Sequence, residues 1–107
     1  MMGRRVLWVA RCIDRSGSSS AQQRKDHMEA HFSYIETIID SIAFAGPITS
    51  EDGDKIIGSM LAFKTEELQE AQLWLSRDPY FSCGIWEKTE WSRVVAAAGD
   101  LVDGTTW

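Results

Sequence analysis

The sequence lacks the two features that would direct a chain to a membrane or through one. Its longest apolar runs are far too short to cross a bilayer, which takes about 20 consecutive apolar residues. It also shows no export leader, because Arg11 and Asp14 interrupt the apolar run that follows Arg4 and Arg5. We therefore expect a soluble, cytoplasmic protein that does not bind membranes.

Cysteine and clustered positive charge are scarce as well. The chain has two cysteines, Cys12 and Cys83, and without an export signal we expect free thiols rather than a disulfide. The formal net charge is −5, and no cluster of lysine and arginine offers the phosphate contacts that nucleic-acid binding needs. These observations argue against nucleic acid as a partner.

What is present is the composition of one globular domain. A chain of 107 residues with 44% hydrophobic and 25% charged side chains is long enough to bury a core of its own. We expect a single domain, residues 1–107, with its core at about residues 5–95. The tail at 96–107 has too little pattern for an assignment.

Hydrophobic spacing predicts the order strand, helix, strand, strand, helix, strand. The expected ranges, in that order, are 5–13, about 20–43, 48–49, 56–63, 65–77 and 85–94. This order is that of the split βαβ arrangement of ferredoxin-like α+β folds, in which both helices cover one face of the sheet.

The first predicted helix has a start signal and an apolar stripe. Ser20 and Gln23 have the spacing of a capping box. The stripe is expected to pack on the sheet. Its members are Met28, Phe32, Ile35, Ile39 and Ile42, with Ile38 widening it.

The first predicted strand is apolar on both faces, although only one face can lie beneath the helices. One face carries Val6, Trp8, Ala10 and Cys12, and the other carries Leu7, Val9 and Ile13. Large exposed apolar patches usually mark an interface. We therefore expect a homodimer in which a second subunit covers the uncovered face.

Two local signals mark places where the backbone is constrained. Pro79 fixes its own φ and keeps Asp78 out of the helical region, so the carboxylate of Asp78 is expected at the end of the second helix. Gly58 lies in the middle of a predicted strand, where glycine often allows a ligand or another backbone to come close.

Several short motifs occur together in an order that resembles a known family. They are Arg24 and His31 in the first helix, Ala45-Gly46-Pro47 after it, Gly58-Ser59 in a strand, and Asp78-Pro79-Tyr80 with Gly84 after the second helix. Over about residues 5–95 the chain resembles the YCII-related (YciI-like) domain family. The resemblance implies a dimeric α+β barrel of ferredoxin-like subunits with an active site at His31 and Asp78. Some relatives are linked to dehydrochlorination of chlorinated aromatics. The chain has Met28 where the family often has an arginine.

A histidine paired with a carboxylate suits proton transfer. The carboxylate fixes the imidazole tautomer and stabilises its protonated form. From the residues alone, a lone histidine beside an apolar stripe is more often a hydrogen-bonded residue at the edge of the core, and Asp78 is a helix-ending turn residue. The family resemblance favours the catalytic interpretation.

Four further residues are candidates for substrate binding: Ser59, Arg24, Tyr80 and Trp86. Ser59 either donates a hydrogen bond to a ligand oxygen or only faces the interior. Tyr80 and Trp86 either line a pocket suited to an aromatic ring or anchor the core or a dimer interface. Cys83 is interpreted as a small packing residue.

The chain offers weak support for a metal. His27 and His31 stand four residues apart on one helix face, a spacing that can bring two imidazoles to one ion. The metalloprotease pattern needs glutamate directly after the first histidine, where this chain has Met28, and no third ligand follows. We expect no metal and no organic cofactor.

The first hypothesis is a small-molecule enzyme of lyase or isomerase type. His31 moves a proton on a cyclic or chlorinated aromatic substrate, and Asp78 orients His31. The alternative is a non-catalytic ligand-binding or accessory protein, and a third is a structural interaction module. The enzyme hypothesis requires His31 and Asp78 within hydrogen-bond reach, beside an open cavity.

Overall fold

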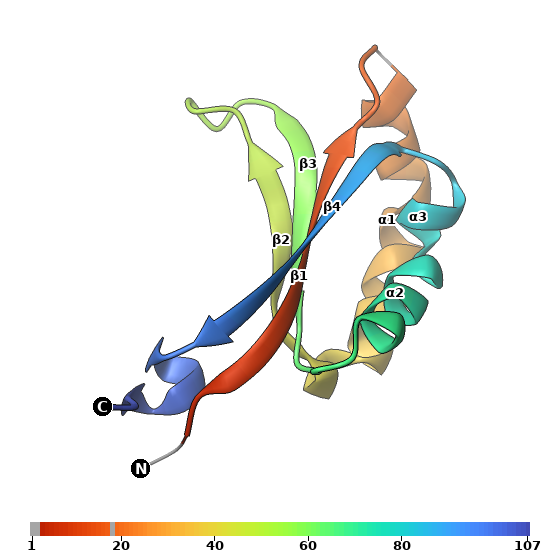
Figure 1. The fold of residues 1–107 in the computed structure, drawn as a ribbon. Coiled ribbons are helices and arrows are strands. Elements are labelled where there is room, and N and C mark those ends of the chain that lie inside the picture. Colours follow the sequence, from red (N-terminus) through yellow and green to blue (C-terminus); the bar gives the residue numbers. More distant parts are fainter. Residues whose placement is uncertain (1–2, 18) are drawn as a thin grey trace.

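The computed structural model describes residues 3–17 and 19–107 (Figure 1). Its main elements, in chain order, are β1 (Arg5–Asp14), α1 (Ser19–Thr37), the 3-10 helix η1 (Ile39–Ser41), β2 (Ile42–Thr49), β3 (Ile56–Phe63), α2 (Leu68–Ser76), α3 (Pro79–Ser82) and β4 (Trp86–Ala96). The tail adds β5 (Ala98–Gly99), the 3-10 helix η2 (Asp100–Val102) and β6 (Gly104–Thr105).

Strands β1 to β4 form one antiparallel sheet in the order β2-β3-β1-β4. Because β3 lies between β1 and β2, the chain must cross over from β1 to β2, and α1 makes that connection. Figure 1 shows α1, α2 and α3 on the same side of this twisted sheet. The predicted α+β class, with helices on one face of an antiparallel sheet, is confirmed.

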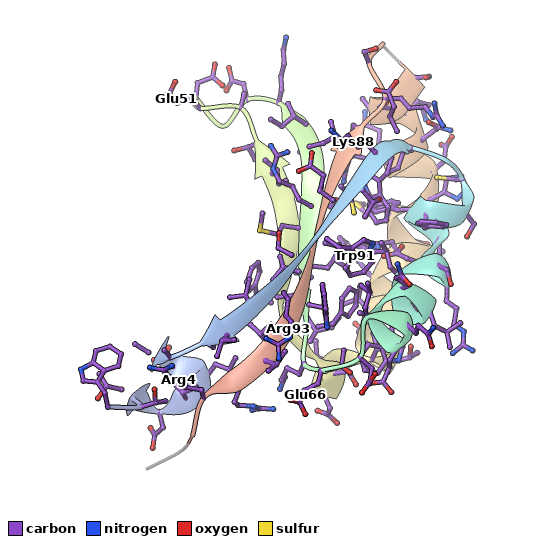
Figure 2. All side chains as sticks on the ribbon, viewed as in Figure 1. Arg4, Glu51, Glu66, Lys88, Trp91 and Arg93 are labelled. Atoms are coloured by element: carbon purple, nitrogen blue, oxygen red, sulfur yellow. The ribbon has the colours of Figure 1, made fainter. Side chains whose placement is uncertain are left out.

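The core lies between the sheet and the helices. Ala10 and Cys12 of β1 and Leu61 and Phe63 of β3 are buried there, as members of one cluster with side chains of α2 and β4. Trp91 projects from β4 into the same layer (Figure 2). Each large side chain buried this fully contributes about 1.5–3 kcal/mol relative to exposure, so this layer is the main source of stability.

Gly58 is required by a close approach between two strands. A Cβ atom built on Gly58 would overlap the backbone carbonyl oxygen of Cys12 in β1. The neighbour is therefore another backbone, one of the two possibilities that the sequence left open. The strand cannot shift without disturbing the β1–β3 ladder, in which Gly58 lies opposite Ile13.

Replacing Gly58 with alanine is expected to destabilise the fold by about 1–3 kcal/mol, the usual cost of forcing an extra carbon into packed structure. Urea unfolding of the variant, followed by circular dichroism, should show a midpoint below that of the natural chain. Gly46→Ala on β2 is the matched control, since a Cβ at Gly46 meets no atom within 4 Å. Equal midpoints for the two variants would contradict this explanation.

The first helix and the strand after it differ from their predicted ranges. The helix ends at Thr37 rather than near Ala43, and β2 begins at Ile42 rather than at Ile48. Ile39 and Ile42 fit the helical spacing, but Ile42 pairs with Phe63 across the sheet. Cross-strand pairing of this β-branched segment outweighs its helical periodicity.

The predicted start and stripe of α1 also need correction. Ser20 lies inside α1, and its hydroxyl donates to the carbonyl of Arg15 at 2.7 Å, so no capping box forms with Gln23. Instead, the Gln23 side chain donates to the Cys83 carbonyl. Ile35 and Ile38 do pack against the core, but Met28 and Phe32 remain 42% and 54% exposed.

The tail is more regular than its sequence indicated. Strands β5 and β6 pair with each other, and η2 between them places Val102 in a fully buried position. The Arg4 guanidinium donates to the Thr106 hydroxyl, which holds the tail beside the start of β1 (Figure 1). Across residues 3–17 and 19–107, no helix has the length and apolar character needed to cross a membrane.

Candidate active site

Asp78 is placed by the turn between α2 and α3. Pro79 begins α3 and holds Asp78 in an extended conformation, with φ −70° and ψ 129°. One carboxylate oxygen of Asp78 accepts a hydrogen bond from the Tyr80 backbone N–H at 2.9 Å, which caps α3. The side chain is completely buried. The turn that the Asp-Pro pair predicts therefore fixes a carboxylate inside the protein.

His31 projects from α1 onto this carboxylate. Its Nδ1 lies 2.8 Å and 2.9 Å from the two carboxylate oxygens of Asp78. Because a carboxylate only accepts hydrogen bonds, we assign the proton of the neutral imidazole to Nδ1. The Nε2 atom is then left with a free lone pair, which is the form that a general base requires.

The ring of Tyr80 stacks against the imidazole of His31 and restricts its orientation. The two rings stack with centroids 4.0 Å apart and an angle of 14° between their planes. Burial raises the pKa of Tyr80, while the charge of Arg24 acts in the opposite direction. The phenol therefore stays protonated near neutral pH, and it donates to the backbone carbonyl of Arg24 at 3.3 Å.

Arg24 is held by Asp14, a residue that the sequence analysis did not single out as part of a site. The Arg24 Nε and Nη2 atoms each lie 2.8 Å from an oxygen of Asp14, and Nη2 also donates to the Ser59 hydroxyl at 3.0 Å. Burial alone would lower the pKa of Arg24, but the hydrogen bonds and charge of Asp14 outweigh it, so the pKa is raised. Arg24 thus remains charged, yet its charge is balanced by Asp14.

Trp86 lies behind the site rather than in it. Its side chain is buried in the core and meets the Tyr80 ring nearly edge-on, with centroids 6.0 Å apart. Of the four residues predicted to bind substrate, Arg24, Ser59 and Tyr80 line the cavity described below, whereas Trp86 supports the inner side of Tyr80.

A cavity of about 1150 Å³ opens in front of these side chains. Its walls come from α1, the end of β1 and the neighbouring strands β2 and β3, and both His31 and Tyr80 face it. His31 is 14% exposed, whereas its partner Asp78 is sealed inside. The arrangement therefore presents a positioned imidazole to a ligand and keeps the orienting carboxylate away from water.

The other candidate groups do not join this site. His27 is outside the cavity lining, and within the described part of the chain no group of three or more His, Cys, Asp or Glu side chains could hold a metal ion. Cys12 and Cys83 are both free thiols. Burial raises the pKa of Cys12 to about 11, which keeps it as an unreactive thiol near neutral pH.

The sequence pattern of the YCII-related domain matches residues 6–94. This chain belongs to the YCII-related domain family. A similar protein, Xenovulene A biosynthesis cluster protein asL2 from Sarocladium schorii, is 34% identical over an alignment of 92 residues, and the match covers 78% of this chain and 80% of that protein.

A similar solved structure is that of 5-chloro-2-hydroxyhydroquinone dehydrochlorinase (TftG) from Burkholderia phenoliruptrix AC1100, in complex with 2,5-dihydroxybenzoquinone. The TM-score is 0.72 and the sequence identity 29%, and the match covers 91% of this chain and 99% of TftG. The YCII membership predicted from the motifs is thus confirmed, and one structure with this fold holds a small oxygenated ring.

Proposed function

We propose that this YCII-related protein is a lyase or isomerase that transfers a proton on a hydroxylated aromatic or quinone-type ring. The observation that carries the proposal is the His31–Asp78 pair, in which buried Asp78 holds Nδ1 and leaves Nε2 for a ligand in the cavity. The ring ligand bound to TftG, a protein of the same fold, supports the substrate class.

The reaction begins when Nε2 of His31 takes the proton of a ring hydroxyl. The electron pair of the broken O–H bond moves into the ring, and the imidazolium returns the proton to the ring carbon that carries the leaving group, which becomes tetrahedral. Loss of the proton of a second ring hydroxyl then sends its electron pair through the ring to that carbon, and a leaving group such as chloride departs with the electrons of its bond to carbon. Loss of HCl from a chlorinated hydroquinone gives a quinone without an external oxidant, because chloride carries away the electron pair. Without a leaving group, return of the proton to a ring carbon gives an isomer. In either case Asp78 stabilises the imidazolium that forms.

The neighbours of His31 suit a ligand with several oxygen atoms. The hydroxyl of Ser59 accepts from Arg24 and so has its own proton available for a ligand oxygen. Tyr80 supports the imidazole plane and restricts where the ring can lie. Asp14 offsets the charge of Arg24, which disfavours ligands that need an unpaired cation.

We also propose that two subunits associate through the sheet face opposite the helices, as the dimeric α+β barrel requires. Strand pairing places Val9, Phe44, Met60 and Val94 on this face, since their neighbours in sequence point toward the helices. Phe44 and Val94 are 51% and 41% exposed. These four apolar side chains form a patch on this face, beside the charged Arg11 and Glu90. Such a patch is best buried against a second copy of itself.

The direct test of the enzyme proposal is a chloride-release assay with 5-chloro-2-hydroxyhydroquinone. The protein should accelerate chloride release and the appearance of quinone absorbance. With the chlorine-free ring in D₂O, it should accelerate exchange of ring hydrogens seen by proton NMR, which detects proton transfer without a leaving group. Ring binding without either reaction would identify a ligand-binding protein instead. Absence of both binding and reaction would reject the proposal.

A further inference from the structure

The cavity is much larger than a single oxygenated ring needs. Pockets that take entire drug-sized ligands have volumes of roughly 300–1,000 Å³, and this cavity has about 1150 Å³. Its lining residues on α1 extend from Ser20 to Glu36, a distance of about 24 Å at the helical rise of 1.5 Å per residue. A ring placed at His31 therefore leaves most of the cavity for another part of the ligand.

The rest of the lining includes apolar side chains that the fold leaves uncovered. Met28 and Phe32 of α1 and Ile56 and Ile57 of β3 all line the cavity, and they are 42%, 54%, 48% and 42% exposed, respectively. We call these four residues the apolar wall. Apolar side chains on the inner face of a helix and on a strand normally pack against each other. Here all four line an open cavity and stay partly exposed, so their apolar surface is free to contact a ligand.

The charges near the cavity do not favour a strongly ionic ligand. Arg24 is paired with Asp14, and His31 with Asp78. The remaining charged side chains of the lining are the cations Arg15, Lys25 and Lys55 and the carboxylates Glu36 and Asp54, so only one cation is left in excess. A nucleotide or another polyanionic group would find little net attraction here, whereas an uncharged apolar group would gain from burial.

We propose that the natural ligand is a phenol or quinone ring that carries an apolar arm of several carbon atoms, with the ring at His31 and the arm against the apolar wall. This inference rests on the proposed function only in placing the ring at His31. The position of Met28 is consistent with it, because this position faces the cavity with a thioether instead of a cation. Thioethers adapt well to flexible apolar ligands.

The test is a binding series of 2,5-dihydroxybenzoquinones that carry no arm or a linear alkyl arm of two, four, six or eight carbons. Isothermal titration with the purified full chain should show affinity rising by roughly two- to fourfold per added methylene until the arm fills the wall. In Phe32→Ser this gain per methylene should fall, and the slope against arm length is the readout because Phe32 also lies beside His31, with ring centroids 5.8 Å apart. Phe32 is exposed, so the variant is expected to fold, and a melting curve verifies it.

Phe81→Ser is the matched control, because Phe81 is 45% exposed on α3 and lies outside the cavity lining. It should keep the dependence on arm length. An affinity independent of arm length in the natural chain would overturn the inference. The same result is expected if a segment of a partner subunit fills the cavity, because no room is then left for the arm. If the ring without an arm is then still converted, the proposed function stands. Binding that depends on arm length without conversion of any member would support the apolar arm and reject the proposed enzyme function. No binding by any member would reject both proposals.

Discussion

Replacing His31 with glutamine is expected to lower kcat/KM for the ring substrate by roughly 10²- to 10⁴-fold, the usual contribution of a general base. Glutamine can still hydrogen-bond to Asp78, but it cannot take a proton. The loss should fall mainly on kcat, because the side chain acts in the transition state rather than in ring binding. Steady-state chloride release and circular dichroism of the same preparation separate lost chemistry from lost folding.

His27→Gln provides the control for that experiment. His27 stands four residues earlier on α1 and does not line the cavity, so the same substitution changes neither the pair with Asp78 nor the wall of the site. Its kcat/KM should match that of the natural chain. If the two variants lose activity equally, or if His31→Gln keeps full activity, then His31 is not the base.

If the proposed dimer forms, replacing Phe44 with aspartate is expected to convert it into a folded monomer at micromolar concentration. Phe44 is half exposed in the single subunit, so a carboxylate there does not disturb the core. In a symmetric dimer the change introduces two unpaired carboxylates into an interface that typically buries about 800 Å² per partner. Each buried charge without a partner costs several kcal/mol, which exceeds what the loss of a few contacts would cost.

Light scattering coupled to size exclusion measures the mass of each species directly. Ser16→Asp adds the same charge in the exposed loop before α1, and this variant should remain dimeric. If the natural chain is already a folded monomer at micromolar concentration, the dimeric barrel is wrong. The catalytic proposal would then have to stand on the cavity of a single subunit.

Much of the fold follows from patterns that are local in the sequence. The apolar strands β1 and β3 and the Asp78-Pro79 turn lie where their residues predict, because β-branched runs and proline act on their own backbone. The end of α1 does not lie where its residues predict, because residues 38–42 suit a helix and a strand equally well. Their conformation depends on Phe63, whose pairing with Ile42 is a contact across the sheet.

Part of the candidate site also followed from local sequence patterns, and part of it did not. The motifs identified His31 and Asp78, and the structure brings them to 2.8 Å. The pairing of Arg24 with Asp14 was missed, because the bidentate contact joins the end of β1 to α1 across the intervening loop. The only signal in the sequence is a carboxylate at the end of an apolar strand. Likewise, Met28 and Phe32 have the spacing of core residues, and nothing local reveals that they line an open cavity.

The double role of Asp78 affects how relatives of this chain should be compared. The same carboxylate caps α3 through the Tyr80 amide and orients His31. A descendant that abandoned catalysis would still lose helix stability on losing this aspartate, so selection for folding alone would preserve it. The histidine has no such second duty among its hydrogen bonds here. Across lineages, retention of the histidine is therefore the trait that would track chemistry, and retention of the aspartate would track the architecture.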